Sequence, residues 1–331
     1  MNIVVLYSLP TRRALATPFK ATDEDTKDSA EEVAVALTAK GARVELVAVG
    51  EDSINRITRI SADVIFNLIE WDGLDTPFFL KALGLIEMRG IPFTGPSLAT
   101  MTKLIDKVKM KEALDIAGIP TPRWQLFTEG TEPTRDDFSY PVIMKLAWEH
   151  CSVGLTRNAI IDRQEDLSSN VIEHIRTFHQ PVYVEEFIDG REFQVTVLEQ
   201  NGVPAVMPVA EIVFDKTGKD SFLTFESRWD EEHPDYGLSS VKKAEILTTL
   251  KTKLEQVSLA AHRTLEFADY SRMDIRVRGE DPFVLEANAN PGLGDDEDYG
   301  MTVSYRAAGM TFADFVWKIV ESCLRRSTSG R

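Results

Sequence analysis

Arg272-Met273-Asp274-Ile275-Arg276 and Val284-Leu285-Glu286-Ala287-Asn288-Ala289-Asn290-Pro291-Gly292 are the two stretches of this sequence that decide its fold. Both contain the apolar residues of core strands, and Asn-Pro-Gly ends the second one abruptly. Residues two apart in a strand point to the same face, so Glu286 and Asn288 should project together, as should the arginine and aspartate of the first stretch. We therefore expect two adjacent strands that present an arginine and three oxygen-bearing side chains.

This set of side chains is typical of a site for metal ions and phosphates. Carboxylate and amide oxygens suit hard Mg²⁺ ions, which bind the phosphates of a nucleotide and keep several waters. The predicted metal ligands are Asp274, Glu286 and Asn288, with Arg272 beside them. The alternative is an edge hairpin with a solvated acidic face, which a high charge content often produces. It fits poorly, because the residues between the polar ones are those of a core strand.

The bulk composition limits the class of protein. A chain of 331 residues is beyond a single small core, so two or three subdomains are expected. The net charge of −16 argues against a general nucleic-acid binder, although a local cluster of Lys and Arg can still hold a nucleotide. The two cysteines, Cys151 and Cys323, give no disulfide framework, which fits a reducing cytoplasm. No apolar run approaches the roughly 20 residues of a membrane helix, so we expect no membrane partner.

Residues 1 to 95 alternate strand and helix. Strands are expected at 3–7, 44–49 and 64–68, and the short apolar runs indicate parallel strands buried on both faces. Helices are expected from the capping box at Ser29 to Gly41, and from Thr76-Pro77 to Gly90. This pattern predicts a doubly wound α/β unit, whose ligands lie beyond the carboxyl ends of the strands.

The rest of the chain mixes further strands and helices. A lysine-rich helix is expected over 104–117, and a loop over 149–154. The other expected elements are strands at 141–145, 182–188 and 192–198 and helices at about 242–266 and 311–325.

Two lysines are candidate phosphate ligands, because lysine supplies a compact positive charge. Lys107 follows Asp106 in a helix crowded with lysines, so a solvated helix face is the alternative interpretation. Lys145 ends an apolar strand just before a loop, where a solvated charge is less expected.

Three further segments are candidates for nucleotide binding. The loop at 149–154 could cradle phosphates with its backbone amides and Ser152, or be a surface turn. Glu185-Glu186-Phe187-Ile188 has the layout of an interdomain hinge whose backbone pairs with an adenine edge, and Glu192 would then reach the ribose; the alternative is a strand with acidic ends. Arg228 is flanked by aromatic residues, where it could stack and bind phosphate, or lie in a surface loop.

In this order, these segments resemble the ATP-grasp superfamily, and most closely its D-alanine–D-alanine ligase branch. The resemblance covers nearly the whole chain, and its most specific parts are Phe93-Thr94-Gly95-Pro96-Ser97, Asp106-Lys107 through Gly118-Ile119-Pro120, Pro141 to Lys145, Ser152-Val153-Gly154 and the block 272–292. It implies an ATP-grasp fold of the α/β (α+β) class, in which two sheets clamp ATP. The expected subdomains are 1–95 (the doubly wound unit), 96–184 (with the phosphate loop) and 185–331 (with the metal and catalytic site).

The resemblance also implies an activity and roles for single residues. The expected enzyme is an ATP-dependent carboxylate–amine ligase that forms an amide through an acylphosphate, with small-molecule substrates and often a homodimeric state. The resemblance assigns the phosphate contacts to Lys107, Lys145, Ser152 and Arg228. It assigns the adenine contacts to Glu185, Glu186 and Ile188, and the ribose contact to Glu192. The expected ligands of two Mg²⁺ ions, or of Mn²⁺ in their place, are Asp274, Glu286 and Asn288. Arg272 and the Gly292 N–H match the groups that stabilise the tetrahedral intermediate, and Glu24 matches the acid that receives the first substrate's ammonium group.

The segment after Asn-Pro-Gly departs from the family pattern. Where D-alanine ligases have a hydroxyl residue for the carboxylate of the second amino acid, this chain has Leu293-Gly294-Asp295-Asp296-Glu297-Asp298. Four carboxylates would repel a substrate carboxylate. Either the acceptor is cationic and binds Asp296 and Glu297, or the segment lies away from the site. The segment Asn67 to Asp75 also differs from the histidine-glycine loop of typical D-alanine ligases.

These departures predict a ligase with altered acceptor specificity. The alternatives are an authentic D-alanine–D-alanine ligase and a non-ligating ATP-binding protein or phosphotransferase. The intact set around Arg272 argues against a pure binder, which has little use for an arginine at an oxyanion.

Overall fold

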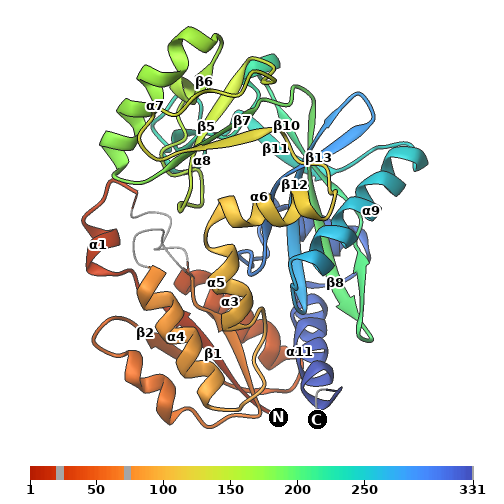
Figure 1. Ribbon diagram of the computed structural model, residues 1–331. Coiled ribbons are helices and arrows are strands. Elements are labelled where there is room, and N and C mark those ends of the chain that lie inside the picture. The colour runs from red at the N-terminus through yellow and green to blue at the C-terminus, as the bar shows by residue number, and fades with distance from the viewer. Residues whose placement is uncertain (20–25, 71–75, 330–331) are drawn as a thin grey trace.

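The computed structural model describes residues 1–19, 26–70 and 76–329. These residues form a mixed α/β protein with three sheets, each covered by helices (Figure 1). None of the described helices combines the length and the apolar composition that a membrane crossing requires.

The first sheet belongs to the N-terminal unit. Its three parallel strands are β1 (Asn2–Ser8), β2 (Arg43–Val49) and β3 (Val64–Leu68), in the order β2-β1-β3, which confirms the expected strands. Around it lie α1 (Arg12–Leu15), α3 (Thr26–Ala39), a 3-10 turn (Ile54–Arg59) and α4 (Thr76–Met88). The expected start of a helix at Ser29 is wrong, because α3 already begins at Thr26 and Ser29 lies inside it.

The helix expected over 104–117 begins three residues later than expected. It is α6 (Lys107–Ile116), and a separate helix, α5 (Leu98–Leu104), precedes it, with Asp106 between the two. Asp106 has extended backbone angles, and its side chain accepts a hydrogen bond from the Val108 N–H at 2.9 Å. Such an N-cap starts a new helix, so Lys107 stands at the first position of α6 and not in the middle of a helix face.

The second sheet has four antiparallel strands in the order β4-β7-β5-β6. They are β4 (Trp124–Phe127), β5 (Val142–Leu146), β6 (Ile160–Ile161) and β7 (Val182–Glu186), with a short 3-10 turn (Arg157–Ala159) before β6. The helix α7 (Gln164–Phe178) packs against this sheet, and together they form a hydrophobic core of their own. The expected subdomain boundary after residue 184 falls inside β7, so we propose a boundary after this strand instead.

The third and largest sheet is antiparallel, in the order β11-β10-β8-β12-β13, with β9 paired to β8. Its strands are β8 (Arg191–Gln200), β9 (Val203–Val206), β10 (Ala210–Phe214), β11 (Ser239–Lys243), β12 (Tyr270–Arg278) and β13 (Asp281–Asn288). The helices in this part are a 3-10 turn (Gly218–Asp220), α8 (Phe225–Trp229), α9 (Thr248–Thr264), α10 (Gly300–Ala307) and α11 (Phe312–Ser329). The helix expected from 242 starts only at Thr248, because residues 242 and 243 are the end of β11.

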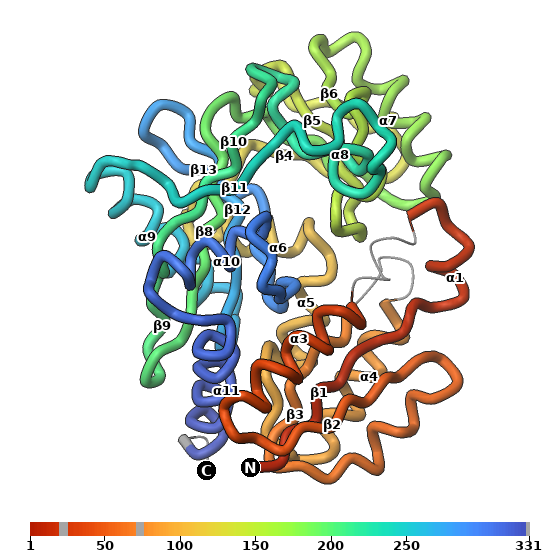
Figure 2. Tube along the Cα trace, turned by 180° about the vertical axis from the view of Figure 1, so that it is seen from behind, coloured from red at the N-terminus to blue at the C-terminus, as the bar shows by residue number. Residues whose placement is uncertain are grey.

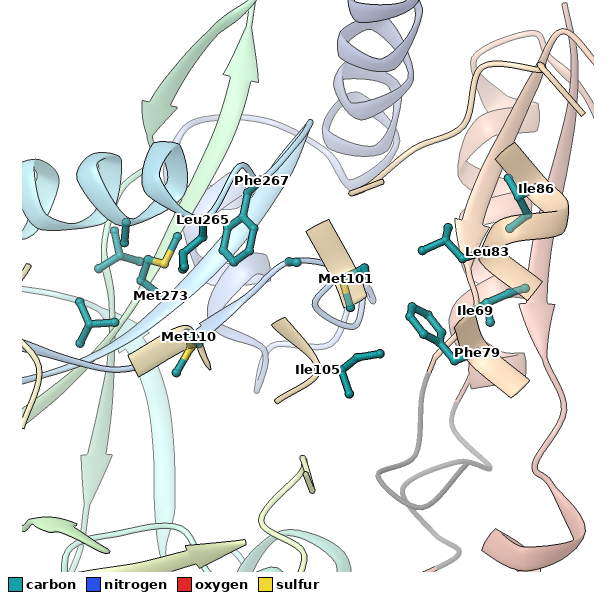
Figure 3. Close-up of a cluster of buried hydrophobic side chains, with 14 of the residues drawn as sticks. Ile69, Phe79, Leu83, Ile86, Met101, Ile105, Met110, Leu265, Phe267 and Met273 are labelled. Atoms are coloured by element: carbon teal, nitrogen blue, oxygen red, sulfur yellow. The ribbon is translucent and has the colours of Figure 1, made fainter. Parts of the chain in front are cut away.

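A continuous hydrophobic core joins the N-terminal unit to the third sheet (Figure 3). Phe79 and Leu83 of α4 lie on one side, Met273 of β12 lies on the other, and Met101 and Ile105 of α5 lie between them. The last helix, α11, packs against α3, so it lies beside the N-terminal unit at the base of the molecule (Figure 2). The second sheet stands apart from this base and faces the third sheet across the candidate site.

Candidate active site

The predicted site residues meet in one cavity of about 230 Å³. It is bounded by the second sheet, the third sheet and the residues that follow β3, at the carboxyl end of a strand, where the doubly wound unit was expected to face its ligands. Its lining includes every predicted site residue except three: Lys107, Lys145, Ser152, Glu185, Glu186, Ile188, Glu192, Arg228, Arg272, Asp274, Glu286, Asn288 and Gly292. Of the three, Glu24 lies outside the described residues, and Asp296 and Glu297 lie outside the lining.

The hairpin of β12 and β13 supplies the oxygen-bearing wall of the cavity. The two strands are antiparallel neighbours, as predicted, with Arg272 opposite Asn288 and Asp274 opposite Glu286. A register shift follows Asp274, as in a β-bulge, which changes the direction of side chains locally. Arg272 donates from Nε and one terminal nitrogen to the two oxygens of Asp274, at 2.8 and 3.0 Å, and Asn288 Nδ2 donates to the same carboxylate at 3.1 Å.

The two carboxylates of this wall differ in their electrostatics. Burial raises the pKa of Asp274, and the Arg272 guanidinium only partly offsets this effect. Burial also opposes ionisation of Glu286, but the ammonium group of Lys107, 2.8 Å away, outweighs it and holds the pKa of Glu286 at about 2. Each carboxylate is therefore matched with one cation from the protein.

The donor set fits a hard divalent cation. Two carboxylates and an amide oxygen are ligands that Mg²⁺ accepts, provided that phosphates and waters complete the coordination. Among the described residues, no cluster of three or more His, Cys, Asp or Glu side chains is arranged to hold a metal ion by itself. The set therefore suits an ion that arrives together with a ligand rather than a permanently caged one.

Two lysines on different elements line the cavity. Lys107 extends from the first position of α6 to Glu286, and its side chain is only 13% exposed, so it does not lie on a solvated helix face. Lys145, on β5, contacts Glu185 Oε1 at 2.6 Å. Glu185 is buried, and its other oxygen pairs with Lys111 of α6. The sequence interpretation gave Lys111 no role; the signal it missed is the spacing of four residues from Lys107, which puts both lysines on one helix face.

The loop at 149–154 carries two consecutive residues with left-handed backbone, Cys151 at φ 52° and Ser152 at φ 63°. Non-glycine residues adopt this conformation rarely, and successive amides in such turns form concave anion sites. His150 Nδ1 lies 3.0 Å from Cys151 Sγ; although burial opposes it, this ring lowers the pKa of the Cys151 thiol. Trp229 Nε1 donates a hydrogen bond to the Cys151 carbonyl at 3.2 Å, which connects α8 to the loop.

Arg228 lies on α8 and lines the same cavity. Its guanidinium carbon is 5.4 Å from the centre of the Trp229 ring, which confirms the predicted stacking, although the segment is a short helix and not a loop. Stacking on a ring fixes the plane of the guanidinium without using its N–H groups. These donors therefore keep a fixed direction and remain available to a ligand.

The segment after β7 has the geometry of a connection between the second and third sheets. Arg276 of β12, which the sequence interpretation did not single out, is buried here. It donates to the Ile188 carbonyl at 3.0 Å and to Glu192 Oε2 at 2.8 Å, and it stacks on Phe187. A guanidinium that holds both the backbone and the acidic side chain fixes the shape of this connection.

The end of β3 adds a residue that was not proposed as a site residue. Glu70 lines the cavity, its backbone N–H donates to Ser8 Oγ at 3.1 Å, and its carboxylate accepts a hydrogen bond from Thr26 at 3.2 Å. It shares the lining with Arg272 and Gly292. Residues 71–75 of the unusual segment, which follow it, lie outside the described residues.

The acidic segment is neutralised mainly by Arg306 of α10. This arginine contacts Asp295 at 2.8 Å and Glu297 at 2.9 Å, and the Asp298 N–H donates to Asp296 at 3.0 Å. Asp296 and Glu297 are exposed. Their role as substrate ligands therefore stays a prediction without support from the cavity lining.

Comparisons with known proteins give a consistent result. A family model described as "D-ala D-ala ligase C-terminus" matches residues 114–321. The chain is 31% identical over 273 residues to the uncharacterized protein y4sG of Sinorhizobium fredii (80% of this chain, 76% of that one). It is 31% identical over 247 residues to a D-alanine–D-alanine ligase of Desulforudis audaxviator (73% of this chain, 76% of that one).

Solved structures share the fold at lower sequence identity. A D-alanine–D-alanine ligase from Bacillus anthracis, in complex with ATP, superposes with a TM-score of 0.76 at 19% identity, covering 100% of both chains. The D-alanine–D-alanine ligase from Coxiella burnetii gives a TM-score of 0.74 at 16% identity, covering 100% of this chain and 95% of that one.

Proposed function

Because this chain belongs to the D-alanine–D-alanine ligase family and is an ATP-dependent ligase of the ATP-grasp type, we propose that it activates a substrate carboxylate with ATP and joins it to an amine. The observation that supports this is the composition of one cavity. Lys107, Lys145 and Arg228 supply positive charge, Asp274 and Glu286 supply oxygens, and Arg272 and Gly292 also line the cavity.

The first step is transfer of the γ-phosphoryl group to the carboxylate. This chemistry needs little covalent help from a protein and depends on positioning and charge neutralisation. We assign the phosphates to Lys107, Lys145, Ser152 and Arg228. Asp274, Glu286 and Asn288 would hold Mg²⁺, which neutralises phosphate charge when bound. The nucleoside is assigned to the connection after β7, with Glu192, oriented by Arg276, at the ribose.

The second step joins the acylphosphate to the amine. The amine nitrogen attacks the acyl carbon, the C–O bond to phosphate breaks, phosphate leaves and the amine loses a proton. The carbonyl oxygen carries negative charge in the tetrahedral intermediate. We assign the stabilisation of this oxyanion to Arg272 and the Gly292 N–H.

The first substrate is proposed to be an amino acid. Glu70 puts a carboxylate in the lining that also contains Arg272 and Gly292, which suits the ammonium group of a substrate whose carboxylate reacts there. Glu24 keeps the role of an additional ammonium ligand as a prediction.

The acceptor is proposed to differ from D-alanine, on the basis of the sequence after Gly292. The second candidate is authentic D-alanine–D-alanine ligation, and two observations favour it. Relatives of about the same length carry that name, and the acidic side chains bind Arg306 outside the cavity lining. A non-ligating binder or a phosphotransferase would form no amide, so analysis of the product separates these from both.

The test is ADP release from ATP and Mg²⁺ with D- and L-amino acids, singly and in pairs, followed by mass analysis of the products. Release with D-alanine alone, giving the dipeptide, would support the second candidate. Turnover with a cationic amine and none with D-alanine would support the altered acceptor. In that case Asp296→Asn with Glu297→Gln should raise KM for the amine and leave KM for ATP unchanged; equal effects on both would exclude these residues as substrate ligands.

Two further expectations concern the whole protein. A homodimer is proposed from the resemblance, and a cytoplasmic location from the two cysteines, which give no disulfide framework. Light scattering coupled to size exclusion measures the first, and fractionation of cells that express the protein tests the second.

A further inference from the structure

Lys111 is a lysine with 0% of its side chain exposed. A buried ammonium group is costly unless it is paired and hydrogen-bonded. Its Nζ lies 2.6 Å from Glu185 Oε2, 2.7 Å from Thr121 Oγ1 and 3.3 Å from the Val284 carbonyl. These partners belong to β7, to the segment after α6 and to β13, so one ammonium group forms an ion pair and two hydrogen bonds with different parts of the fold.

Glu185 is shared between Lys111 and a second lysine. Its Oε1 lies 2.6 Å from Lys145 Nζ, and Glu185 itself is 1% exposed. Burial opposes ionisation of Glu185, but the two ammonium groups outweigh it and lower its pKa. Two cations and one anion in contact leave one net positive charge. Lys145 is 18% exposed and is the lysine of this cluster that lines the cavity.

We infer that Lys111 is a positioning residue that neutralises Glu185, so that the charge of Lys145 remains available to the nucleotide phosphates. Without Lys111, Glu185 would neutralise Lys145 alone, and the cluster would present no net charge to the cavity. Charges in a partly buried site interact strongly over several ångströms, because the effective dielectric is far below that of water. The inference rests on the proposed function, since it takes the phosphates to lie beside Lys145.

A purely structural role makes a different prediction. Lys111 also connects α6, β7 and β13, so its loss could loosen the whole site. Loosening would weaken every ligand of the cavity alike. Loss of charge would weaken ligands in proportion to the phosphates they carry and leave an uncharged nucleoside unaffected.

The experiment is isothermal titration calorimetry of the full chain with ATP, ADP and adenosine, each with Mg²⁺. Lys111→Met should raise the Kd of ATP about tenfold or more, raise that of ADP less and leave that of adenosine unchanged. Lys111→Met with Glu185→Gln leaves Lys145 as the one charge of the cluster. Because Glu185 is also a predicted adenine contact, the readout for this variant is the ratio of the adenosine Kd to the ATP Kd, which should return to near the wild-type value. Lys109→Met, on the exposed face of the same helix, is the matched control and should change none of the three.

Several outcomes would overturn the inference. Equal weakening of ATP and adenosine by Lys111→Met would assign Lys111 a structural role only, and failure of the double variant to recover would exclude the charge argument. If Lys111→Met does not fold, Glu185→Gln, which keeps both lysines, decides: with two uncompensated lysines it should prefer ATP over adenosine more strongly than the wild type does, and an unchanged preference would refute the inference. A wild-type protein that binds ATP no better than adenosine would instead refute the proposed phosphate site.

Discussion

Arg272 is held in one orientation by Asp274. Two parallel hydrogen bonds, at 2.8 and 3.0 Å, fix the plane of its guanidinium. A guanidinium held by two parallel hydrogen bonds presents its positive charge in one fixed orientation. A flexible lysine ammonium group carries the same charge without a fixed orientation. The remaining donors of Arg272 are therefore positioned before any substrate binds, as stabilisation of a developing oxyanion requires.

This geometry makes a prediction for the variant Arg272→Ala. Loss of an oxyanion donor should lower kcat by about a hundredfold or more, because the interaction forms only in the transition state. Steady-state kinetics with saturating ATP and acid substrate would measure it. Arg278→Ala, an exposed arginine on the same strand, is the control and should keep normal kcat. A change in KM with normal kcat would contradict the role of Arg272.

Short capped elements set the position of several site residues. Asp106 starts α6 and thereby positions Lys107 beside Glu286, whereas the lysine pattern alone predicts a helix that already begins at residue 104. The strands could be predicted, because buried parallel strands and alternating hairpin strands leave clear apolar patterns. Lys111 and Arg276 could not, because only the packing of distant strands makes their burial and pairing visible.

The turn after β4 depends on one carboxylate. Glu132 accepts hydrogen bonds from the N–H groups of Thr128, Glu129 and Gly130 at 2.6, 3.0 and 2.8 Å, and from the Thr128 hydroxyl at 2.7 Å. Although burial opposes it, these donors lower the pKa of Glu132 to about 2. A carboxylate whose pKa is lower in the folded than in the unfolded state stabilises the fold above its ordinary pKa of about 4.3, and this contribution disappears as the pH falls through the folded value.

The prediction concerns Glu132→Gln. At pH 7 the variant should be less stable than the wild type by about 1 to 2 kcal/mol, because charge-assisted bonds to the turn are lost. The difference should shrink between about pH 4.3 and pH 2, where the wild-type carboxylate becomes protonated as well. Urea unfolding across this range measures it. Glu129→Gln on the same turn is the control, and a difference that persists unchanged at pH 2 would exclude the charge as the cause.

At the scale of the molecule, an ion pair between the buried Asp269 and Arg326 connects the last helix to the segment around Phe93–Gly95. Asp269, 0% exposed, contacts Arg326 of α11 at 2.8 Å and accepts a hydrogen bond from the Gly95 N–H at 2.8 Å. Arg326 also donates to the Phe93 carbonyl at 2.9 Å. The Phe93–Ser97 motif could be recognised from sequence, but its link to the last helix could not, because the residues lie more than two hundred positions apart.

Removal of this arginine should destabilise the protein. Arg326→Ala leaves Asp269 buried beside Gly95 without its cation, which costs about 3 kcal/mol and lowers Tm by roughly 5 °C. Differential scanning calorimetry measures the shift. Arg325→Ala, whose side chain bonds Asn201 at the surface, is the control and should change Tm little. Equal Tm values for the two variants would contradict the importance of the pair.

The three sheets are not three independent bodies, because two of them share one hydrophobic core. The core shared by α4, α5 and β12 makes the N-terminal unit and the third sheet a single base, whereas the second sheet and α7 form a cluster of their own among the described residues. The molecule is therefore described as two bodies: the N-terminal unit with the third sheet, and the second sheet with α7. A turn of the second sheet and α7 about the connection after β7 would open and close the cavity, and it would also shift the packing of this sheet against Val108 of α6.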